Sequence, residues 1–131
     1  MTLLRTLAVV LFASVAAAAP QAHMVFFTLA DPSEENRDML VAACHEHLSG
    51  HEGTIYFSVG EIAAGRDRDV NDQAFHVALH MVFDSPESHD KYQTHPRHLK
   101  FIATAKSLFS GVRVFDSDLV PAKEASVSVD Q

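Results

Sequence analysis

The sequence predicts a small α+β domain in which a strand, a helix, two strands, a helix and a strand follow one another. The 131 residues are enough for about one domain. Hydrophobic residues make up 47% of the chain, with only 5 Gly and 5 Pro, which indicates a packed core rather than a disordered or fibrous chain. Segments with a repeat of two alternate with segments in which apolar residues recur every four positions, as strands and helices require.

Residues 1–18 have the layout of a secretory signal peptide. Arg5 supplies a positive charge, a short apolar run follows, and small residues precede Ala19 at the expected cleavage site. The apolar run is shorter than the ~20 residues that cross a bilayer, so we expect no stable membrane insertion after its removal. The sequence therefore predicts an exported protein, periplasmic or secreted. If the segment is not a working signal, the protein is cytoplasmic.

A short linker at 19–22 leads into a first strand and a first helix. The run 23–29 is rich in aromatic and β-branched residues, which predicts a strand. Asp31 is predicted to cap the helix, with Pro32 in its first position. The apolar stripe of this helix consists of Leu40, Cys44 and Leu48, spaced four residues apart. Since Cys44 is the only cysteine, an internal disulfide is excluded, and we expect a small buried side chain.

Two more strands are predicted on either side of a charged loop at 65–72. Residues 54–59 form the first of them, and 75–83 form the second. The second strand alternates strictly, so that its side chains divide between two faces of the sheet. Phe75, Val77, Leu79, Met81 and Phe83 are predicted on one face, and His76, Ala78, His80 and Val82 on the other.

The C-terminal third is predicted to form a broken helix and a last strand. Ser85 and Pro86 begin the helix, and Pro96 interrupts it, because the residue before a proline avoids the helical region. The strand follows at 112–115, and a loose tail is expected at 121–131. The second half of the broken helix is predicted to place Leu99, Ile102, Lys106 and Phe109 along one side.

This order of elements predicts a ferredoxin-like βαββαβ protomer whose helices cover one face of a four-stranded sheet. The other face carries His76 and His80 together with the smaller Ala78 and Val82. In a monomer this mixed face would be in contact with water. Burial against a second copy suits it better, so we expect a homodimer in which two sheets form an α+β barrel.

Three segments of the chain resemble the stress-responsive A/B barrel family. They are the opening strand at 23–27, the strand at 75–83 with its end at 82–85, and the segment Lys91-Tyr-Gln-Thr-His-Pro-Arg-His98; the closing 114–116 also fits. The resemblance covers about residues 23–120 and implies a dimeric A/B barrel. The family includes plant stress proteins, many bacterial proteins without an assigned role, and the plant olivetolic acid cyclase.

The resemblance also implies candidate site residues. In the cyclase, a tyrosine and a histidine of the matching segment assist ring closure without a cofactor, and their positions are Tyr92 and His98 here. His23 and His95 also have counterparts in the cyclase, whereas its central-strand histidine falls at Val77. That part of the pocket is therefore not reproduced. We expect an apolar cavity between sheet and helices that is lined by His23, His95, His76, Phe26 and Leu99.

A histidine and a tyrosine at one apolar pocket can move a proton next to a carbonyl group. His98 would act as the base, and Tyr92 would donate a hydrogen bond to the resulting enolate. Because Pro96 lies between them, the sequence leaves open whether they share a face. The alternative is that His98 packs on or caps the helix while Tyr92 fills the core.

Several other functions find no support in the sequence. A net charge of −7 without a basic stretch argues against nucleic-acid binding. No glycine-rich phosphate loop, nucleophile elbow or dinucleotide fingerprint is present, so we predict no cofactor. His76 and His80 would lie ~13 Å apart on a strand, too far to share an ion. His45, His47 and His51 lie around the end of the first helix, but no pair of them has a third well-placed ligand. We therefore predict no metal site.

Two functions remain open from the sequence, and with them the question whether the protein is an enzyme. The first is a small exported, stress-related barrel that holds a small apolar ligand without converting it. The second is a cofactor-free lyase or cyclase that uses His98 and Tyr92 on a β-keto or polyketide-like substrate. A cofactor-free oxygenase is a third reading, but no residue singles it out.

Overall fold

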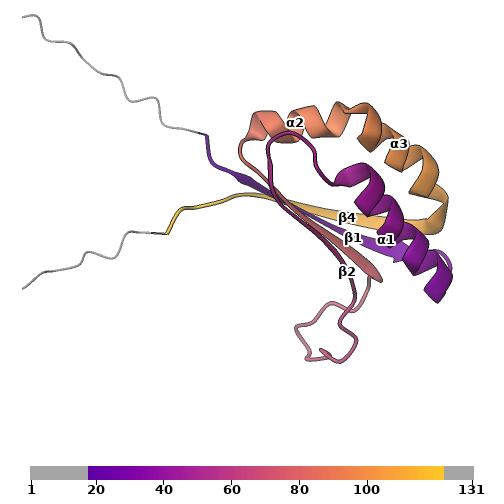
Figure 1. The fold of residues 1–131 in the computed structure, drawn as a ribbon. Helices are drawn as coiled ribbons and strands as arrows, with labels where there is room; N and C mark the ends of the chain where they lie inside the picture. Colours follow the sequence, from indigo (N-terminus) through magenta and orange to yellow (C-terminus); the bar gives the residue numbers. More distant parts are fainter. Residues whose placement is uncertain (1–17, 123–131) are drawn as a thin grey trace, which may run out of the picture.

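The chain folds into one antiparallel four-stranded sheet with all its helices on one face (Figure 1). The computed structural model describes residues 18–122. The sheet order is β2-β3-β1-β4, so the ferredoxin-like fold predicted from the order of elements is confirmed. The elements are β1 Gln21–Leu29, α1 Glu34–Leu48, β2 Thr54–Glu61, β3 Val77–Phe83, α2 Pro86–Thr94, α3 Pro96–Ala105, the 3-10 turn η1 Lys106–Leu108, and β4 Phe109–Asp118.

Parts of the predicted termini lie outside the described residues. Of the predicted signal peptide only Ala18 is described, and of the predicted tail only Pro121 and Ala122. Within residues 18–122, no helix is long and apolar enough to cross a membrane.

The central strand β1 shows how alternation divides the sheet into two faces. His23, Val25 and Phe27 point toward the helices and are buried, whereas Met24 and Phe26 point to the other side and stay partly exposed. We call that other side the open face. It carries Ala22, Met24 and Phe26 of β1, Ala78, His80 and Val82 of β3, Tyr56 and Ser58 of β2, and Phe115 of β4.

The core lies between the sheet and α1. Leu40, Cys44 and Leu48 are fully buried, which confirms the predicted apolar stripe of this helix. They pack against the helix-facing side chains of β3, among which Leu79 and Met81 are also fully buried. Burial raises the pKa of the Cys44 thiol to about 12, so this cysteine is a packing residue and not a nucleophile.

Two predicted boundaries at the N-terminal end were wrong. Gln21 already pairs with Phe83 of β3 and with Asp118 of β4, so half of the predicted linker at 19–22 belongs to β1. Helix α1 is capped by Ser33 rather than by Asp31. The Ser33 hydroxyl accepts a hydrogen bond from the Asn36 backbone N–H at 3.3 Å, which satisfies a donor of the first helical turn.

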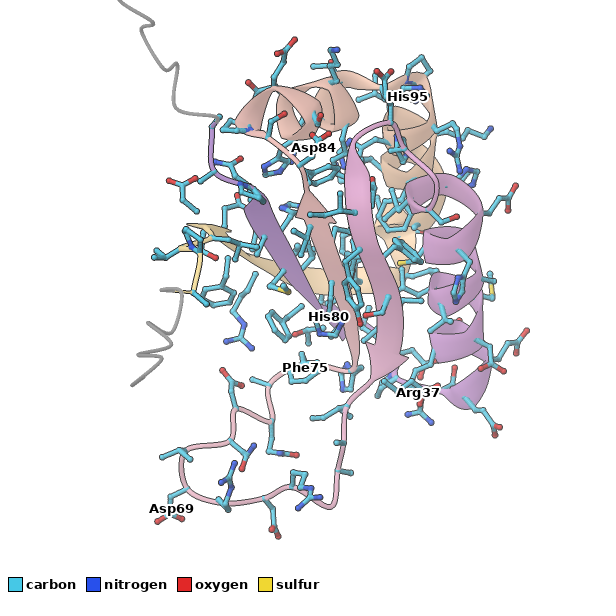
Figure 2. The ribbon with its side chains drawn as sticks, turned by 60° about the vertical axis from the view of Figure 1, so that its left-hand side comes forward. Arg37, Asp69, Phe75, His80, Asp84 and His95 are labelled. Atoms are coloured by element: carbon cyan, nitrogen blue, oxygen red, sulfur yellow. The ribbon has the colours of Figure 1, made fainter. Side chains whose placement is uncertain are left out.

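The predicted alternation of the central strand fails at its beginning. Strand β3 begins at Val77, and Phe75 lies before it, between bends at Ala74 and His76. The ring of Phe75 packs on Phe26, with centroids 5.0 Å apart, and therefore joins the open face near His80 (Figure 2). The period of two holds only where backbone pairing keeps the chain extended, and these bends break it.

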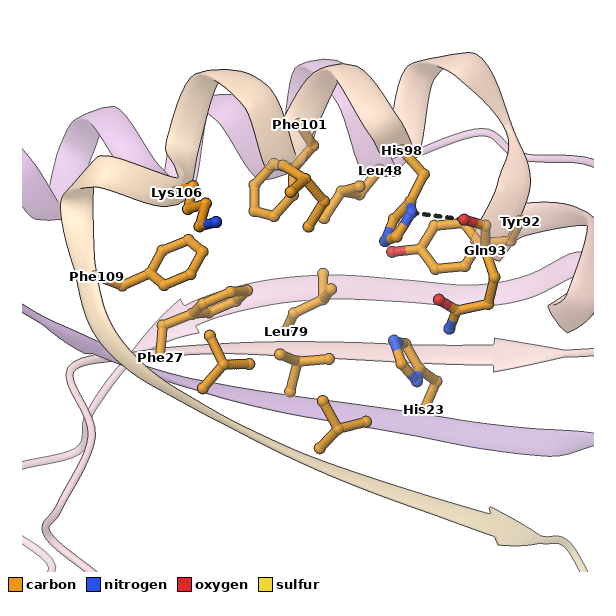
Figure 3. A pocket seen from close by; sticks show the side chains of 14 residues that line it. His23, Phe27, Leu48, Leu79, Tyr92, Gln93, His98, Phe101, Lys106 and Phe109 are labelled. Atoms are coloured by element: carbon orange, nitrogen blue, oxygen red, sulfur yellow. Dashed lines mark hydrogen bonds between the residues drawn. The ribbon is translucent and has the colours of Figure 1, made fainter.

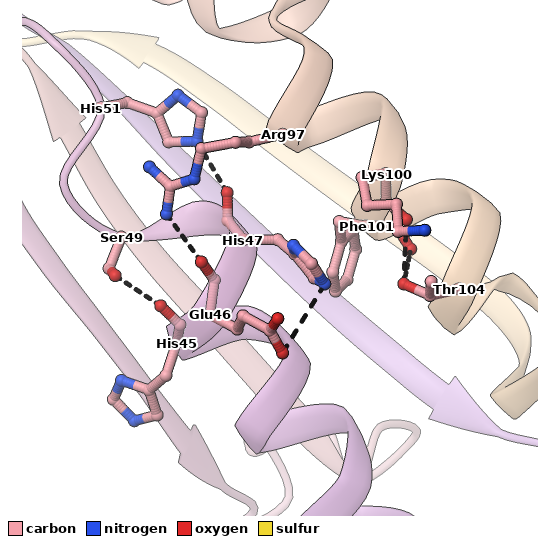
Figure 4. A network of polar contacts seen from close by, with 9 residues as sticks. All are labelled: His45, Glu46, His47, Ser49, His51, Arg97, Lys100, Phe101 and Thr104. Carbon is pink, nitrogen blue, oxygen red and sulfur yellow. Dashed lines mark hydrogen bonds and ion pairs between the residues drawn. The ribbon is translucent and has the colours of Figure 1, made fainter.

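The break predicted between the last two helices is confirmed. His95 separates α2 from α3 with an extended backbone, and its Nδ1 accepts a hydrogen bond from the Arg97 backbone N–H. Beyond it, α3 packs against α1, and an Arg97 guanidinium N–H donates to the Glu46 carbonyl at 2.7 Å (Figure 4). Phe101 and Ala105 follow Arg97 at intervals of four and are buried.

The side chains predicted to lie along α3 do not form its buried side. Leu99 is 55% exposed, because it lies two positions from both Arg97 and Phe101 and so points away from α1. Ile102 and Lys106 are also exposed, but they border a hollow between α3 and the sheet. Contact with α1, rather than the apolar pattern of α3 itself, decides which side is buried.

Replacing Gly53 with alanine is expected to lower the free energy of unfolding by about 2 kcal/mol. Gly53 has φ +80°, and a β-carbon there would lie 2.1 Å from Ser88 Oγ and 2.9 Å from an Asp84 carboxylate oxygen. The matched control is Gly50→Ala, where φ is +69° but no atom lies within 4 Å of the new carbon. Urea unfolding should show a loss of only about 1 kcal/mol for the control. Equal losses of stability in the two variants would show that the close approach of Ser88 and Asp84 to Gly53 has no effect.

Candidate functional site

A pocket of about 460 Å³ opens between α3 and the helix-facing side of the sheet (Figure 3). It exists because α3 packs against α1 and leaves strand β4, at the sheet edge, partly uncovered. Val112 and Val114 are accordingly 42% and 48% exposed. The lining is mostly apolar and comprises Val25, Phe27, Leu48, Leu79, Phe101, Ile102, Phe109, Val112 and Val114, with His23, Tyr92, Gln93, His98 and Lys106 as its polar members.

Four of the five polar lining residues gather at one end of the pocket. Figure 3 shows His23, Tyr92, Gln93 and His98 together there, and Lys106 toward the opposite end. The Tyr92 ring is almost fully buried, with its centroid 4.6 Å from that of His98 and 5.8 Å from that of His23. A molecule that fills this pocket would have an apolar middle and a polar group next to Tyr92.

The hydroxyl group of Tyr92 faces the pocket and is free to bind a ligand (Figure 3). Among residues 18–122, none forms a hydrogen bond with it, although the side chain is only 2% exposed. Burial raises the pKa of this phenol above its usual value, so the group stays protonated and can donate a hydrogen bond. A polar atom of a bound molecule would give this hydroxyl a hydrogen-bond partner, worth about 1 kcal/mol.

His98 presents a free ring nitrogen at the same end of the pocket. Its Nδ1 lies 3.0 Å from the Gln93 carbonyl oxygen, which can only accept, so Nδ1 carries the proton and Nε2 keeps a lone pair. Burial lowers the pKa of His98, and repulsion from nearby histidines lowers it further, against the opposing effect of the Gln93 carbonyl. His98 is therefore neutral at neutral pH and can act as a base.

Behind this end of the pocket lie two sets of hydrogen-bonded side chains. His23 Nδ1 lies 2.6 Å from an Asp116 carboxylate oxygen. His89 Nδ1 lies 3.1 Å from Gln21 Oε1, and its Nε2 lies 3.0 Å from the Gln93 side-chain nitrogen. Gln93 thus connects His89 with His98, because its side chain contacts His89 and its backbone carbonyl accepts a hydrogen bond from His98. The Gln93 carbonyl therefore holds the His98 ring in its orientation.

Tyr92 is also surrounded by histidines on its far side. The ring of His51 lies 4.9 Å from that of Tyr92, at right angles to it, and 4.8 Å from that of His95. Desolvation by burial is the main cause that lowers the pKa of both His51 and His89. Three of the rings near the tyrosine, those of His51, His89 and His98, therefore have a pKa below the usual value.

The structure brings together three of the seven residues that the sequence singled out. Tyr92, His98 and His23 all line the pocket. The proline between Tyr92 and His98, which left their relation open, ends α2 and starts α3 at an angle that turns both side chains toward the sheet (Figure 3).

The other four predicted lining residues lie elsewhere, which corrects the sequence expectation. His95 caps α3 and borders a separate polar depression with His51 and Arg97. His76 precedes β3, and its Nδ1 accepts a hydrogen bond from the Leu29 backbone N–H at 2.9 Å. Phe26 lies on the open face, because it is one residue out of phase with Val25 and Phe27. Leu99 points away from the pocket into solvent.

Sequence reasoning missed Gln93, Asp116, His89 and Phe101 as residues of this region. Gln93 and Asp116 lie inside the segments on which the family resemblance rests, so the motif itself was a signal. His89 is three residues before Tyr92 and shares its helical side, a spacing that could have linked them. No local pattern indicated Phe101, whose burial depends on the contact between α3 and α1.

Comparison with known proteins agrees with this fold. Residues 22–119 match the stress responsive A/B barrel domain, Dabb. A Dabb family protein of ferredoxin-like fold from Mesorhizobium loti is similar, with a TM-score of 0.64 and 20% identity over 80% of this chain and 99% of that one. None of the curated protein sequences matches.

Two further solved structures are similar at the level of the fold. A dimeric ferredoxin-like protein of unknown function from Thermobifida fusca has a TM-score of 0.64 and 14% identity over 78% of this chain and 92% of that one. The hydroxynitrile lyase from Passiflora edulis has a TM-score of 0.64 and 17% identity over 80% and 97%. Since the domain match spans nearly all the described residues, the chain belongs to the stress responsive A/B barrel domain family.

Proposed function

We propose that the protein binds a small, largely apolar molecule in the pocket between α3 and the sheet. The observation that carries this proposal is the Tyr92 hydroxyl, which faces the polar end of the pocket with no hydrogen-bond partner among residues 18–122. The volume of about 460 Å³ lies in the range of small-molecule sites. Tyr92 can donate a hydrogen bond and His98 Nε2 can accept one, so a hydroxyl group or an enolised carbonyl of the ligand satisfies both.

We further propose that the protein acts as an exported homodimer with a stress-related role. The open face supports the dimer, because Tyr56 and Phe115 are each 55% exposed on it and surround smaller apolar side chains. The Thermobifida fusca neighbour is also dimeric. Export is supported by the signal-like pattern of residues 1–18, and a role in stress by the description of the family.

A cofactor-free lyase or cyclase is the second candidate function. The observation in its favour is that neutral His98 and protonated Tyr92 lie next to each other in one apolar pocket. His98 Nε2 would take a proton from the carbon between two carbonyl groups, and the Tyr92 hydroxyl would stabilise the negative oxygen that forms. The structural likeness to a hydroxynitrile lyase agrees with lyase chemistry on this fold.

Replacing Tyr92 with phenylalanine is expected to raise the Kd of a hydroxylated apolar probe about tenfold, the effect of losing one hydrogen bond of about 1.4 kcal/mol. The probe is 1-naphthol, titrated by fluorescence. The matched control is Tyr56→Phe, which removes the same hydroxyl from an exposed tyrosine on the open face and should leave the Kd unchanged. Equal Kd values for wild type and Tyr92→Phe would remove the proposed binding mode, and so would equal losses in both variants.

A further inference from the structure

Three metal-ligating side chains from three different elements meet behind the polar end of the pocket. They are His23 of β1, His89 of α2 and Asp116 of β4, and each offers one ligand atom within 4.8 Å of the others. Both imidazoles are more than nine-tenths buried, whereas the Asp116 side chain at the sheet edge is 48% exposed. No spacing in the sequence joins these residues, because they lie 27 to 93 positions apart.

Two imidazoles and one carboxylate are a ligand set that suits a borderline divalent ion such as Zn²⁺. Zinc binds histidine nitrogen and carboxylate oxygen at about 2.0–2.2 Å, which places neighbouring ligands of a tetrahedral site about 3.3 Å apart. His23 Nδ1 and the Asp116 oxygen are 2.6 Å apart, so they need to separate by less than about 1 Å. The exposed carboxylate of Asp116 has the freedom to make this movement.

We propose that His23, His89 and Asp116 bind one Zn²⁺ ion. The ion takes the place of the proton that His23 Nδ1 now donates to Asp116, and the ring then carries its single proton on Nε2, so His23 binds as a neutral imidazole. His89 gives up one of its two hydrogen bonds with glutamine side chains, and the ring nitrogen that is freed binds the ion. Gln21 Oε1, which lies 3.1 Å from His89 Nδ1, supplies a further oxygen at the same place.

The position of this site gives it a consequence for the pocket. His23 lines the pocket as well as belonging to the cluster, so the ion lies at the polar end next to Tyr92. A zinc ion with three protein ligands keeps a position for water or another oxygen donor. The proposal is independent of the binding mode suggested for Tyr92 and His98, since neither residue is a ligand of the ion.

The test is a zinc titration of the full chain after treatment with a chelator, in competition with a chromophoric chelator. We expect one Zn²⁺ per chain with micromolar affinity or tighter, and a d–d absorption band of four-coordinate geometry when Co²⁺ is used instead. Asp116→Asn should weaken zinc binding about 100-fold, and because Asp116 is half exposed the variant should fold. His89→Gln should do the same, but its ring stacks on Phe83, so Asp116→Asn is the decisive variant.

Two matched controls separate this site from binding by surface groups. Asp69→Asn makes the same change in the exposed loop between β2 and β3, outside the cluster (Figure 2). His45→Gln removes an exposed histidine from the end of α1, where two other histidines lie nearby. Both variants should bind zinc as wild type does. The proposal is overturned if the wild type binds no zinc, if Asp116→Asn binds it unchanged, or if only His45→Gln weakens binding.

Discussion

Replacing Met24 with glutamate is expected to convert the protein from a dimer to a monomer. Met24 lies at the middle of the open face, between His80 of β3 and Phe115 of β4 in the sheet register. In a barrel formed by two such faces, each protomer would bury one unpaired carboxylate. Burying the two charges costs at least about 4 kcal/mol, which raises the dissociation constant about 1,000-fold or more.

Light scattering coupled to size-exclusion chromatography measures this change. The control is Met39→Glu, an identical substitution at a methionine that is 51% exposed on α1, the helix on the opposite side of the sheet. It should remain dimeric. A wild-type protein that is monomeric at tens of micromolar would disprove the proposed dimer, and a dimeric Met24→Glu variant would show that another surface forms the interface.

Replacing His98 with glutamine is expected to abolish proton transfer if the protein is a lyase or cyclase. The probe reaction is deuterium exchange at the carbon between the two carbonyl groups of benzoylacetone, followed by NMR in the presence of a chelator. His98 Nε2 breaks the C–H bond, Tyr92 donates to the enolate oxygen, and the imidazolium returns a deuteron after exchange with solvent. Loss of a general base lowers the rate about 100- to 10,000-fold.

The pH dependence of this exchange follows from the two pKa shifts. Burial, together with His23, His51 and His89 facing its ring, lowers the pKa of His98 from 6.5, so the base is neutral at pH 6.5 and above. The rate should fall only as the pH drops through the lowered value. Burial raises the pKa of Tyr92 above 10, so the donor is retained up to that pH. The profile should therefore be flat from pH 6.5 to 10.

His95→Asn is the control for the exchange reaction. His95 belongs to the same sequence segment but caps α3 outside the pocket, and asparagine can also cap a helix. Its rate should equal that of wild type. No exchange above background in the wild-type protein would reject the enzyme and leave the binding function, whereas exchange that survives His98→Gln would reject His98 as the base.

Local patterns in the sequence predicted most of the fold. The Leu40, Cys44 and Leu48 stripe determined the buried side of α1, since residues four apart lie on one side of any helix. Pro96 placed the break between α2 and α3 for the equally local reason that a proline restricts the residue before it. Such patterns failed where a contact with a distant segment decided the outcome, as with Phe75, which turns onto Phe26.

The candidate site was predictable only in part. The segment from Tyr92 to His98 identified two residues of the pocket, because the family resemblance already relates that segment to a pocket. It could not distinguish His98, which lines the pocket, from His95, which caps a helix three residues earlier. That distinction depends on the direction in which α3 leaves the proline, and this direction is set by packing against α1.

The sequence by itself determined the order of the elements, the family and the residues able to move a proton. These follow from interactions between neighbours in the chain, which act in the same way wherever the segment lies. Only the tertiary structure decided that α3 leaves a pocket over β4, that Tyr92 lines it, and that His23, His89 and Asp116 meet. The physical reason is that these features arise between segments far apart in the chain, whose approach is set by how the helices pack on the sheet.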